Sequence, residues 1–295
     1  MNIHSTCVKI LLNQKGKRRN IFMLVKRSFE QQSINNVTFG NGTVAVQGVK
    51  LNVHCFVIDG VLIDTGAQSL AKEFKPFFDE QDIDQVVITH FHEDHTGCAA
   101  YLQKQIQVPI YMSELKLDYC KQKPDYPLYR KYFWGKRAPF HAKPIGKTFS
   151  SRHAKWDVIE TPGHAIDHLS YLNRETGQLF TGDLYCQEKT KVILREESIP
   201  TLIHSLKTVL TYDFEEVFCC HAGYLKDGRL ALQRKLEYLV NLQGNILKLH
   251  ETGNSPSAIK AKLFPKKYPI IFFSSGEWDS LHIIHSVIHE QSLSV

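Results

Sequence analysis

Four side chains of the types that bind metal ions stand within six residues of one another. They are His90, His92, Asp94 and His95, and they directly follow residues 86–89, an apolar run typical of a buried strand. Residues two apart at a strand end point to the same side of the backbone, so His90 and His92 can face one site. Asp94 and His95 follow in a turn that leads through a glycine into a helical pattern. We expect this loop to bring four candidate metal ligands together.

Three more candidate ligands occur much later in the chain, each at the end of a predicted strand. His164 ends a Thr-Pro-Gly-His sequence, Asp183 ends Thr-Gly-Asp, and His221 follows Phe-Cys-Cys. Loops at strand ends are where layered α/β proteins place their chemistry. Imidazole and carboxylate ligands without cysteine suit zinc, manganese or iron, and they argue against a closed structural zinc site. The seven ligands in the sequence are too many for one tetrahedral ion but fit two ions that share a carboxylate.

Strands and helices alternate around these candidate ligands. A β-rich stretch broken by glycines covers residues 37–64, and the later half of the chain returns to the same order of strands followed by strand-helix units. The elements predicted after that stretch are a helix at 67–78, a strand at 86–89, a helix at 96–105, a strand at 106–112, strands at 156–159 and 169–180, a helix at 199–210 and a strand at 216–220. This alternation predicts an α/β fold in which sheets pack between helices.

The two ends of the chain differ from this central part. Residues 1–30 contain seven Lys or Arg and one acid, which accounts for the whole formal charge of +6. We interpret them as a solvated basic tail, so that the basic composition says nothing about the body of the protein. Residues 226–295 are predicted to form a helical C-terminal region, and residues 31–225 are predicted to form the domain that carries the ligands. The C-terminal helices are expected at 226–252, after the N-cap Ser255 as far as Pro265 and Pro269, and at 277–290.

In the order of its ligands, the sequence resembles the metallo-β-lactamase superfamily of metallohydrolases. The matching features are the HxHxDH signature at residues 90–95, the Gly-His at His164, the later Asp183, the final His221, and a Leu-Ile-Asp-Thr-Gly stretch around Asp64. The resemblance covers roughly residues 37–223. It implies a four-layer αββα sandwich with a dinuclear metal centre in a cleft at the ends of its sheets.

The resemblance also implies a role for each ligand. One ion is held by His90, His92 and His164, a second ion is held by Asp94, His95 and His221, and Asp183 bridges them. Asp64 is implied to hydrogen-bond toward a ligand loop and to fix it in place. We expect two Zn²⁺ ions as cofactors, with Mn²⁺ or Fe²⁺ as alternatives.

The chemistry expected of such a centre is hydrolysis by a metal-bridging hydroxide. One zinc ion lowers the pKa of its water from about 16 to about 7, and two ions do at least as much. The hydroxide then attacks a carbonyl or phosphoryl centre, Asp183 holds the bridge, and Asp94 is the candidate proton shuttle. Such an enzyme needs no Ser or Cys nucleophile, and the sequence contains no Gly-x-Ser-x-Gly motif.

The reaction class stays open between several alternatives. The first is hydrolysis of a small-molecule acyl bond, such as a thioester or lactone, as the resemblance to glyoxalase II-like members implies. A phosphodiesterase or nuclease is disfavoured because the neutral body offers little positive surface to a phosphate backbone. A mononuclear iron dioxygenase acting on persulfides would use His90, His164 and Asp183. A noncatalytic binding module is disfavoured by the complete ligand set.

Substrate contacts are expected from an aromatic and basic segment that fits neither half. Residues 123–150 look inserted and place Tyr129, Tyr132 and Trp134 among arginines and lysines. They serve either as packing or as the mouth of the cleft. Tyr185, two residues after Asp183, is a further candidate contact that packing explains equally well.

Composition sets the remaining expectations. The chain has 295 residues, of which 43% are hydrophobic and 22% charged, as expected of a soluble globular protein, and it contains no apolar run long enough to span a membrane. Its seven cysteines lack CxxC spacing, which is typical of reduced thiols in a cytoplasmic protein. We expect a small-molecule substrate and no nucleic acid or membrane partner, and a homodimer is compatible with the sequence.

Overall fold

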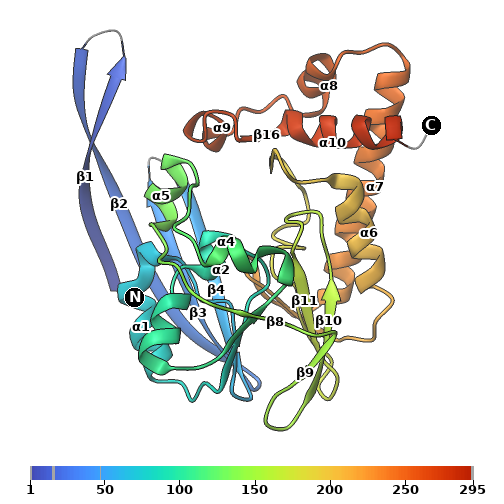
Figure 1. The fold of residues 1–295 in the computed structure, drawn as a ribbon. Helices are drawn as coiled ribbons and strands as arrows, with labels where there is room; N and C mark the ends of the chain where they lie inside the picture. The colour runs from blue at the N-terminus through green and yellow to red at the C-terminus, as the bar shows by residue number, and fades with distance from the viewer. Residues whose placement is uncertain (1, 15–16, 47, 294–295) are drawn as a thin grey trace.

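The alternating strands and helices build two large β-sheets that pack face to face between layers of helix (Figure 1). The computed structural model describes residues 2–14, 17–46 and 48–293. Helices of the first half cover the outer face of one sheet, and α6 and α7 cover the outer face of the other (Figure 1). The predicted four-layer αββα arrangement with a helical C-terminal region is confirmed.

The first sheet begins as an antiparallel meander and ends in parallel strands. In spatial order it contains β1 (Asn2–Gln14), β2 (Lys17–Ile34), β3 (Val37–Val46), β4 (Val49–Ile58), β5 (Val61–Ile63), β6 (Gln85–Val87), β7 (Ile110–Met112) and β8 (Lys143–Pro144). Neighbours pair antiparallel up to β5, and β5 to β8 pair parallel. The meander predicted for residues 37–64 is therefore confirmed.

The second sheet comes from the later half of the chain. In spatial order it contains β15 (Gly223–Leu225), β14 (Glu216–Cys219), β12 (Gln178–Phe180), β11 (Leu169–Asn173), β10 (Lys155–Glu160) and β9 (Thr148–Ser150). Its strands are antiparallel except for the parallel pair β12 and β14. A small separate ladder joins β13 (Ile193–Leu194) to β16 (Trp278–Asp279).

The helices described in the first half have at most nine residues, and the second half contains the three longest described helices, of 11, 24 and 14 residues. The first group contains η1 (Gln68–Leu70), α1 (Ala71–Asp79), α2 (Glu93–Thr96), α3 (Ala99–Tyr101), a π-helical turn η2 (Leu102–Ile106), η3 (Glu114–Lys116), α4 (Leu117–Cys120) and α5 (Leu128–Trp134). The second group contains α6 (Ile199–Val209), α7 (Gly228–Glu251), α8 (Pro256–Leu263), α9 (Pro269–Phe273) and α10 (Ser280–Leu293). No helix in the described ranges is long and apolar enough to cross a membrane.

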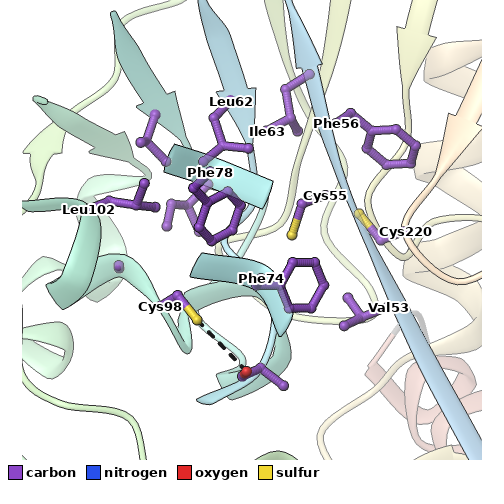
Figure 2. Packing of buried hydrophobic residues seen from close by; sticks show 14 of the residues in the cluster. Val53, Cys55, Phe56, Leu62, Ile63, Phe74, Phe78, Cys98, Leu102 and Cys220 are labelled. Atoms are coloured by element: carbon purple, nitrogen blue, oxygen red, sulfur yellow. Dashed lines mark hydrogen bonds between the residues drawn. The ribbon is translucent and has the colours of Figure 1, made fainter. Parts of the chain in front are cut away.

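The core has one layer on each side of the first sheet. Figure 2 shows Cys55 on the side of Phe74 and Phe78, which come from α1, and Phe56 on the opposite side. Successive residues of a strand point to opposite faces, so β4 contributes to both layers. Between the sheets, the Phe56 ring lies 5.5 Å from Phe180 and 5.6 Å from Phe218, measured between centroids. These aromatic contacts join the two sheets beneath the ligand loops.

The described cysteines are unpaired, as the sequence predicts. Most are buried among apolar neighbours, and Cys98 makes a weak contact from its Sγ to the Ala67 carbonyl (3.8 Å, Figure 2). The predicted core role of Cys7 lies outside the residues whose side chains are described.

Residues 2–14 and 17–34 form β1 and β2 of the first sheet, and the prediction of a solvated tail is wrong at Val25 and Phe29, which join the core. β1 pairs with β2 along its length, and β2 continues this ladder onto β3 from Val25 to Ile34. Val25 is fully buried, and the Phe29 ring meets that of Phe74 at 5.1 Å. These two anchors lie four residues apart and share one face of a strand, a pattern that counting charges over the segment does not register.

Deleting residues 1–22 should nevertheless leave the fold intact. The pairing of β2 with β3 starts at Val25, so the deletion removes β1 and the part of β2 that pairs with β1 alone. We expect cooperative thermal unfolding within a few degrees of the full chain and unchanged metal content, measured by calorimetry and elemental analysis. Loss of cooperative unfolding would show that β1 is required.

Residues 143–150 of the segment 123–150 reach both sheets, whereas the expectation from composition placed the whole segment outside them. β8 extends the first sheet beside β7, and β9 extends the second sheet beside β10. The segment therefore crosses from one sheet to the other. Its strands have two and three residues, which is too short for any alternation to show in the sequence.

The C-terminal helices follow the predicted order with one addition. The Ser255 hydroxyl accepts a hydrogen bond from the Ala258 N–H (3.3 Å) and caps α8, as expected. Pro269 does not end a helix but starts α9, at the first position, where a proline lacks no needed N–H group. α9 packs against α5, with the Phe133 and Phe273 rings 5.7 Å apart.

Candidate metal centre

The loops that carry the candidate ligands meet at one end of the sandwich. They are residues 88–95 after β6, 161–168 between β10 and β11, 181–183 after β12, and 220–222 between β14 and β15. The parallel strands β12 and β14 pair at Phe180 and Phe218, so their ends coincide. The Leu169 N–H donates to the Thr89 carbonyl (2.8 Å) and joins the two sheets at this end.

Three histidines form the first group of converging atoms. His92 Nδ1 lies 3.0 Å from His90 Nε2 and 3.0 Å from His164 Nε2. Nitrogen ligands at about 2.1 Å from one tetrahedral zinc lie about 3.4 Å apart, so this spacing is close to that of a shared ion. Burial holds the pKa of His90 well below its usual value, and burial together with the nearby Arg130 guanidinium does the same for His92. A lowered pKa favours the neutral imidazole, which is the form in which histidine binds a metal.

The second group contains one carboxylate and two imidazoles. Asp94 Oδ2 lies 3.6 Å from His95 Nε2 and 3.7 Å from His221 Nε2. All three ligand atoms lie within 4.8 Å of one another. They come from the loop after β6 and from the end of β14, so this group also depends on both sheets.

Asp183 lies between the two groups. Its Oδ2 is 2.9 Å from His221 Nε2 and 3.3 Å from His164 Nε2, and its Oδ1 is 3.5 Å from His95 Nε2. Burial alone would lower the pKa of His221, but the Asp183 carboxylate raises this pKa to about 9. The same negative charge that retains a proton there would attract a metal cation.

Two buried polar atoms at this junction lie 3.5 Å from each other, and neither makes a hydrogen bond of good geometry with a described residue. They are His95 Nε2 and Asp183 Oδ1. Buried polar atoms without a partner are rare in native proteins, and a bound ion is one of the partners that satisfies them. Together with the hard and borderline donor set of His and Asp, this observation fits a divalent metal ion.

Asp64 hydrogen-bonds to the loop that carries the second group, which is the contact that the resemblance implied. Its Oδ2 lies 2.8 Å from His95 Nδ1, and it accepts the Thr89 N–H and the Thr89 hydroxyl at 2.8 Å each. A carboxylate on Nδ1 keeps the proton on that nitrogen and leaves Nε2 as the lone-pair atom facing the site. The side chain is completely buried.

A model of the metallo-beta-lactamase superfamily matches residues 48–221 of this chain, which is more than half of it. The chain belongs to the metallo-β-lactamase superfamily. The matched range includes every candidate ligand and Asp64. The metal-binding character of this superfamily agrees with the His and Asp groups found at the sheet ends.

Relatives in this superfamily include two fungal proteins named as thioesterases. "Thioesterase pkgB" of Emericella nidulans is 31% identical over 152 residues, covering 49% of this chain and 38% of that protein. "Atrochrysone carboxyl ACP thioesterase" of Passalora fulva is 26% identical over 168 residues, covering 56% of this chain and 44% of the relative. The chain thus spans less than half the length of these two relatives.

Solved structures of the superfamily share the fold. The metallo-beta-lactamase from Pontibacter korlensis superposes with a TM-score of 0.55 at 20% identity, covering 72% of this chain and 100% of that structure. At this identity the likeness bears on the fold alone.

Two acidic residues that contact candidate ligands were missed by sequence reasoning. Glu196 Oε1 lies 3.2 Å from His92 Nε2, and Glu197 Oε2 lies 3.0 Å from His164 Nδ1. Both stand in the loop between β13 and α6, with no motif around them, so the sequence carries no signal for their role. The pKa of His164 is raised, because Glu197 and then Asp183 outweigh the effect of burial.

His168 has a structural role beside the candidate ligands. Its Nδ1 lies 2.8 Å from the Thr161 hydroxyl, and its Nε2 accepts the Asp183 backbone N–H at 2.9 Å. His168 therefore holds the backbone of Asp183 in place. It is a positioning residue and not a member of either ligand group.

The predicted substrate contacts divide into two pairs. Trp134 and Tyr185 are 8% and 9% exposed and pack in the cores, which favours the packing alternative for both. Tyr129 and Tyr132 on α5 are half-buried and stay predictions. The neighbouring Arg130, which sequence reasoning did not single out, contacts the loop that carries His92 and Asp94.

Proposed function

We propose that the protein is a metal-dependent hydrolase of thioesters or of related acyl bonds such as lactones. The observation that carries this proposal is the shared Asp183 carboxylate, which lies within 3.5 Å of nitrogens from both ligand groups. A carboxylate in that place is the arrangement needed to hold two cations side by side. The thioesterase names of two curated relatives favour a thioester as the acyl substrate.

The proposed cofactors are two zinc ions, with manganese or iron as alternatives. The first ion would be held by His90, His92 and His164, the second by Asp94, His95 and His221, and both by Asp183. When bound, such ions supply Lewis acidity toward a carbonyl oxygen and lower the pKa of a coordinated water to about 7.

The remaining work would belong to residues of the chain itself. Asp94 is 6% exposed, and its Oδ2 lies 3.6 Å from His95 Nε2 within the second ligand group. From there it would take the proton of the attacking water and deliver it to the leaving group. A thiol leaving group has an ordinary pKa of about 8.5 and needs less protonation than an alcohol, which makes a thioester the less demanding substrate.

The test is a panel assay of the purified protein before and after dialysis against EDTA. The substrates are an acyl thioester, a lactone, an aryl phosphodiester and a persulfide. We expect thioester turnover that falls about 10³-fold on chelation, because several kcal/mol of transition-state stabilisation are lost, and that returns with zinc. Metal analysis should find about two ions per chain.

Each other result identifies a different function. Thioester hydrolysis that survives exhaustive chelation would contradict the metal dependence. Turnover of the phosphodiester alone would favour a nuclease. One iron per chain, with oxygen consumption on persulfide, would favour a dioxygenase.

A further inference from the structure

A buried ion pair joins helix α5 to the loop that carries four of the candidate ligands. Arg130 on α5 donates from Nε to Glu93 Oε1 at 2.6 Å and from Nη2 to Glu93 Oε2 at 2.7 Å. This is a bidentate pair, with two parallel N–H···O bonds, which is the strongest geometry for a guanidinium and a carboxylate. Glu93 stands between His92 and Asp94, so the pair acts on a residue flanked by one ligand from each group.

Glu93 depends on this partner because it is removed from water. Its side chain is 2% exposed, and that of Arg130 is 12% exposed. A carboxylate buried without a cation is strongly destabilised, so Glu93 would either take up a proton or move with its backbone toward solvent. Such a move would displace His92 and Asp94 on either side. The position of both ligands is therefore tied to the guanidinium.

Arg130 is itself held from the opposite side. Its Nη1 donates to Glu277 Oε1 at 3.3 Å, just before β16 in the C-terminal region. α5 is further fixed by the contact of Phe133 with Phe273 of α9. The guanidinium is thus oriented by packing and by a second carboxylate before any metal binds.

We propose that Arg130 is a positioning residue of the metal centre, which sets the place of His92 and Asp94 through Glu93. This inference rests on the metal binding that is part of the proposed function. It assigns Arg130 no contact with substrate. Its consequence is that metal affinity depends on a residue of α5, which belongs to neither ligand group and to none of the four ligand loops.

The experiment measures Co²⁺ binding to the full-length protein, without any substrate. Four variants are compared with the wild type: Arg130→Met, Arg130→Lys, the double variant Glu93→Gln with Arg130→Met, and the control Arg152→Met. Arg152 makes the same bidentate pair, to Asp84 at 2.6 and 2.9 Å, but its side chain is 35% exposed and it lies away from the ligands. Affinity is read by competition with a chelator, geometry by the Co²⁺ absorption spectrum, and folding by thermal unfolding of the metal-free protein.

We expect Arg130→Met to weaken Co²⁺ binding by about 10- to 100-fold, as loss of a supporting partner does at other metal sites, and to change the spectrum. Arg130→Lys should fall between it and the wild type. The double variant should recover much of the affinity, because no unpaired charge stays buried. Arg152→Met should bind like the wild type.

Arg130→Met that folds and binds Co²⁺ with wild-type affinity and spectrum would overturn the proposal. If Arg130→Met does not fold, the decision passes to Arg130→Lys, and wild-type affinity there would overturn it equally. A wild type that binds Co²⁺ but hydrolyses no thioester would contradict the proposed substrate, while the affinities of the variants would still decide the role of Arg130.

Discussion

Asp183→Asn is expected to lower thioester turnover by about 10³-fold while leaving the protein folded. The carboxylate contacts His221 and His164 through Oδ2 and His95 through Oδ1, at 2.9, 3.3 and 3.5 Å. An amide has the same shape but carries no charge and offers only one oxygen. Its NH₂ group would point N–H donors at one of these nitrogens, and it could not serve as the second anionic oxygen shared by the two ligand groups.

The folding of this variant should be little affected. The backbone of Asp183 stays anchored through its N–H to His168 Nε2, which the substitution does not touch. The matched control is Asp125→Asn, which removes the charge of a fully exposed aspartate. Steady-state kinetics and metal analysis should show loss of turnover and of bound metal in Asp183→Asn alone. Turnover within tenfold of the wild type in that variant would remove the shared carboxylate from the mechanism.

The convergence of the candidate ligands could be predicted from the sequence because its signal is local. His90, His92, Asp94 and His95 stand together after one strand, and each later ligand ends a strand of its own. Parallel strands bring their carboxyl ends to one edge of a sheet, so strand prediction alone places the ligands near one another.

The supporting residues could not be predicted, because their partners are far away in sequence. Glu196 lies 104 residues from His92, and Arg130 lies 37 residues from Glu93. Nothing in the residues around them distinguishes these charges from solvated ones. Only the folded chain brings these partners together: Arg130 meets Glu93 in a buried pair, and Glu196 reaches His92 with a side chain that is 53% exposed. No local pattern records either contact.

The same limit explains the errors in the fold. Long amphipathic elements such as α6 and α7 were placed to within a few residues, since their periodicity extends over several turns. β8 and β9 were missed, because strands of two and three residues are defined by their partners β7 and β10. Residues 25–30 of β2 were misread because charge was averaged over a strand with one buried face.

Asp64→Asn should weaken metal binding by the second ligand group and leave binding by the first group unchanged. Asp64 has a backbone φ of +60°, which asparagine tolerates nearly as well as aspartate, so the substitution introduces little backbone strain. Its Oδ2 accepts hydrogen bonds from the Thr89 hydroxyl, His95 Nδ1 and the Cys220 thiol. Its Oδ1 accepts one from the Thr89 N–H. Donors therefore surround both oxygens.

An amide cannot satisfy this arrangement in either orientation. With its NH₂ at the Oδ2 position it opposes His95 Nδ1–H, and with its NH₂ at the Oδ1 position it opposes the Thr89 N–H. Each buried donor left unpaired costs about 1–3 kcal/mol of stability. Relief comes if His95 moves its proton from Nδ1 to Nε2, which removes the lone pair that would bind metal.

We therefore expect Asp64→Asn to bind one ion per chain at limiting metal, with affinity for the second ion reduced about 10- to 100-fold. The matched control is Asp59→Asn, in the turn between β4 and β5. Asp59 also has a positive φ, of +49°, and also accepts several hydrogen bonds, from Ser151 and His153, but at the opposite end of β5. Both variants should lose stability in thermal unfolding, and Asp64→Asn alone should lose metal. Equal metal content in the two variants would mean that the orientation of His95 does not depend on the Asp64 carboxylate.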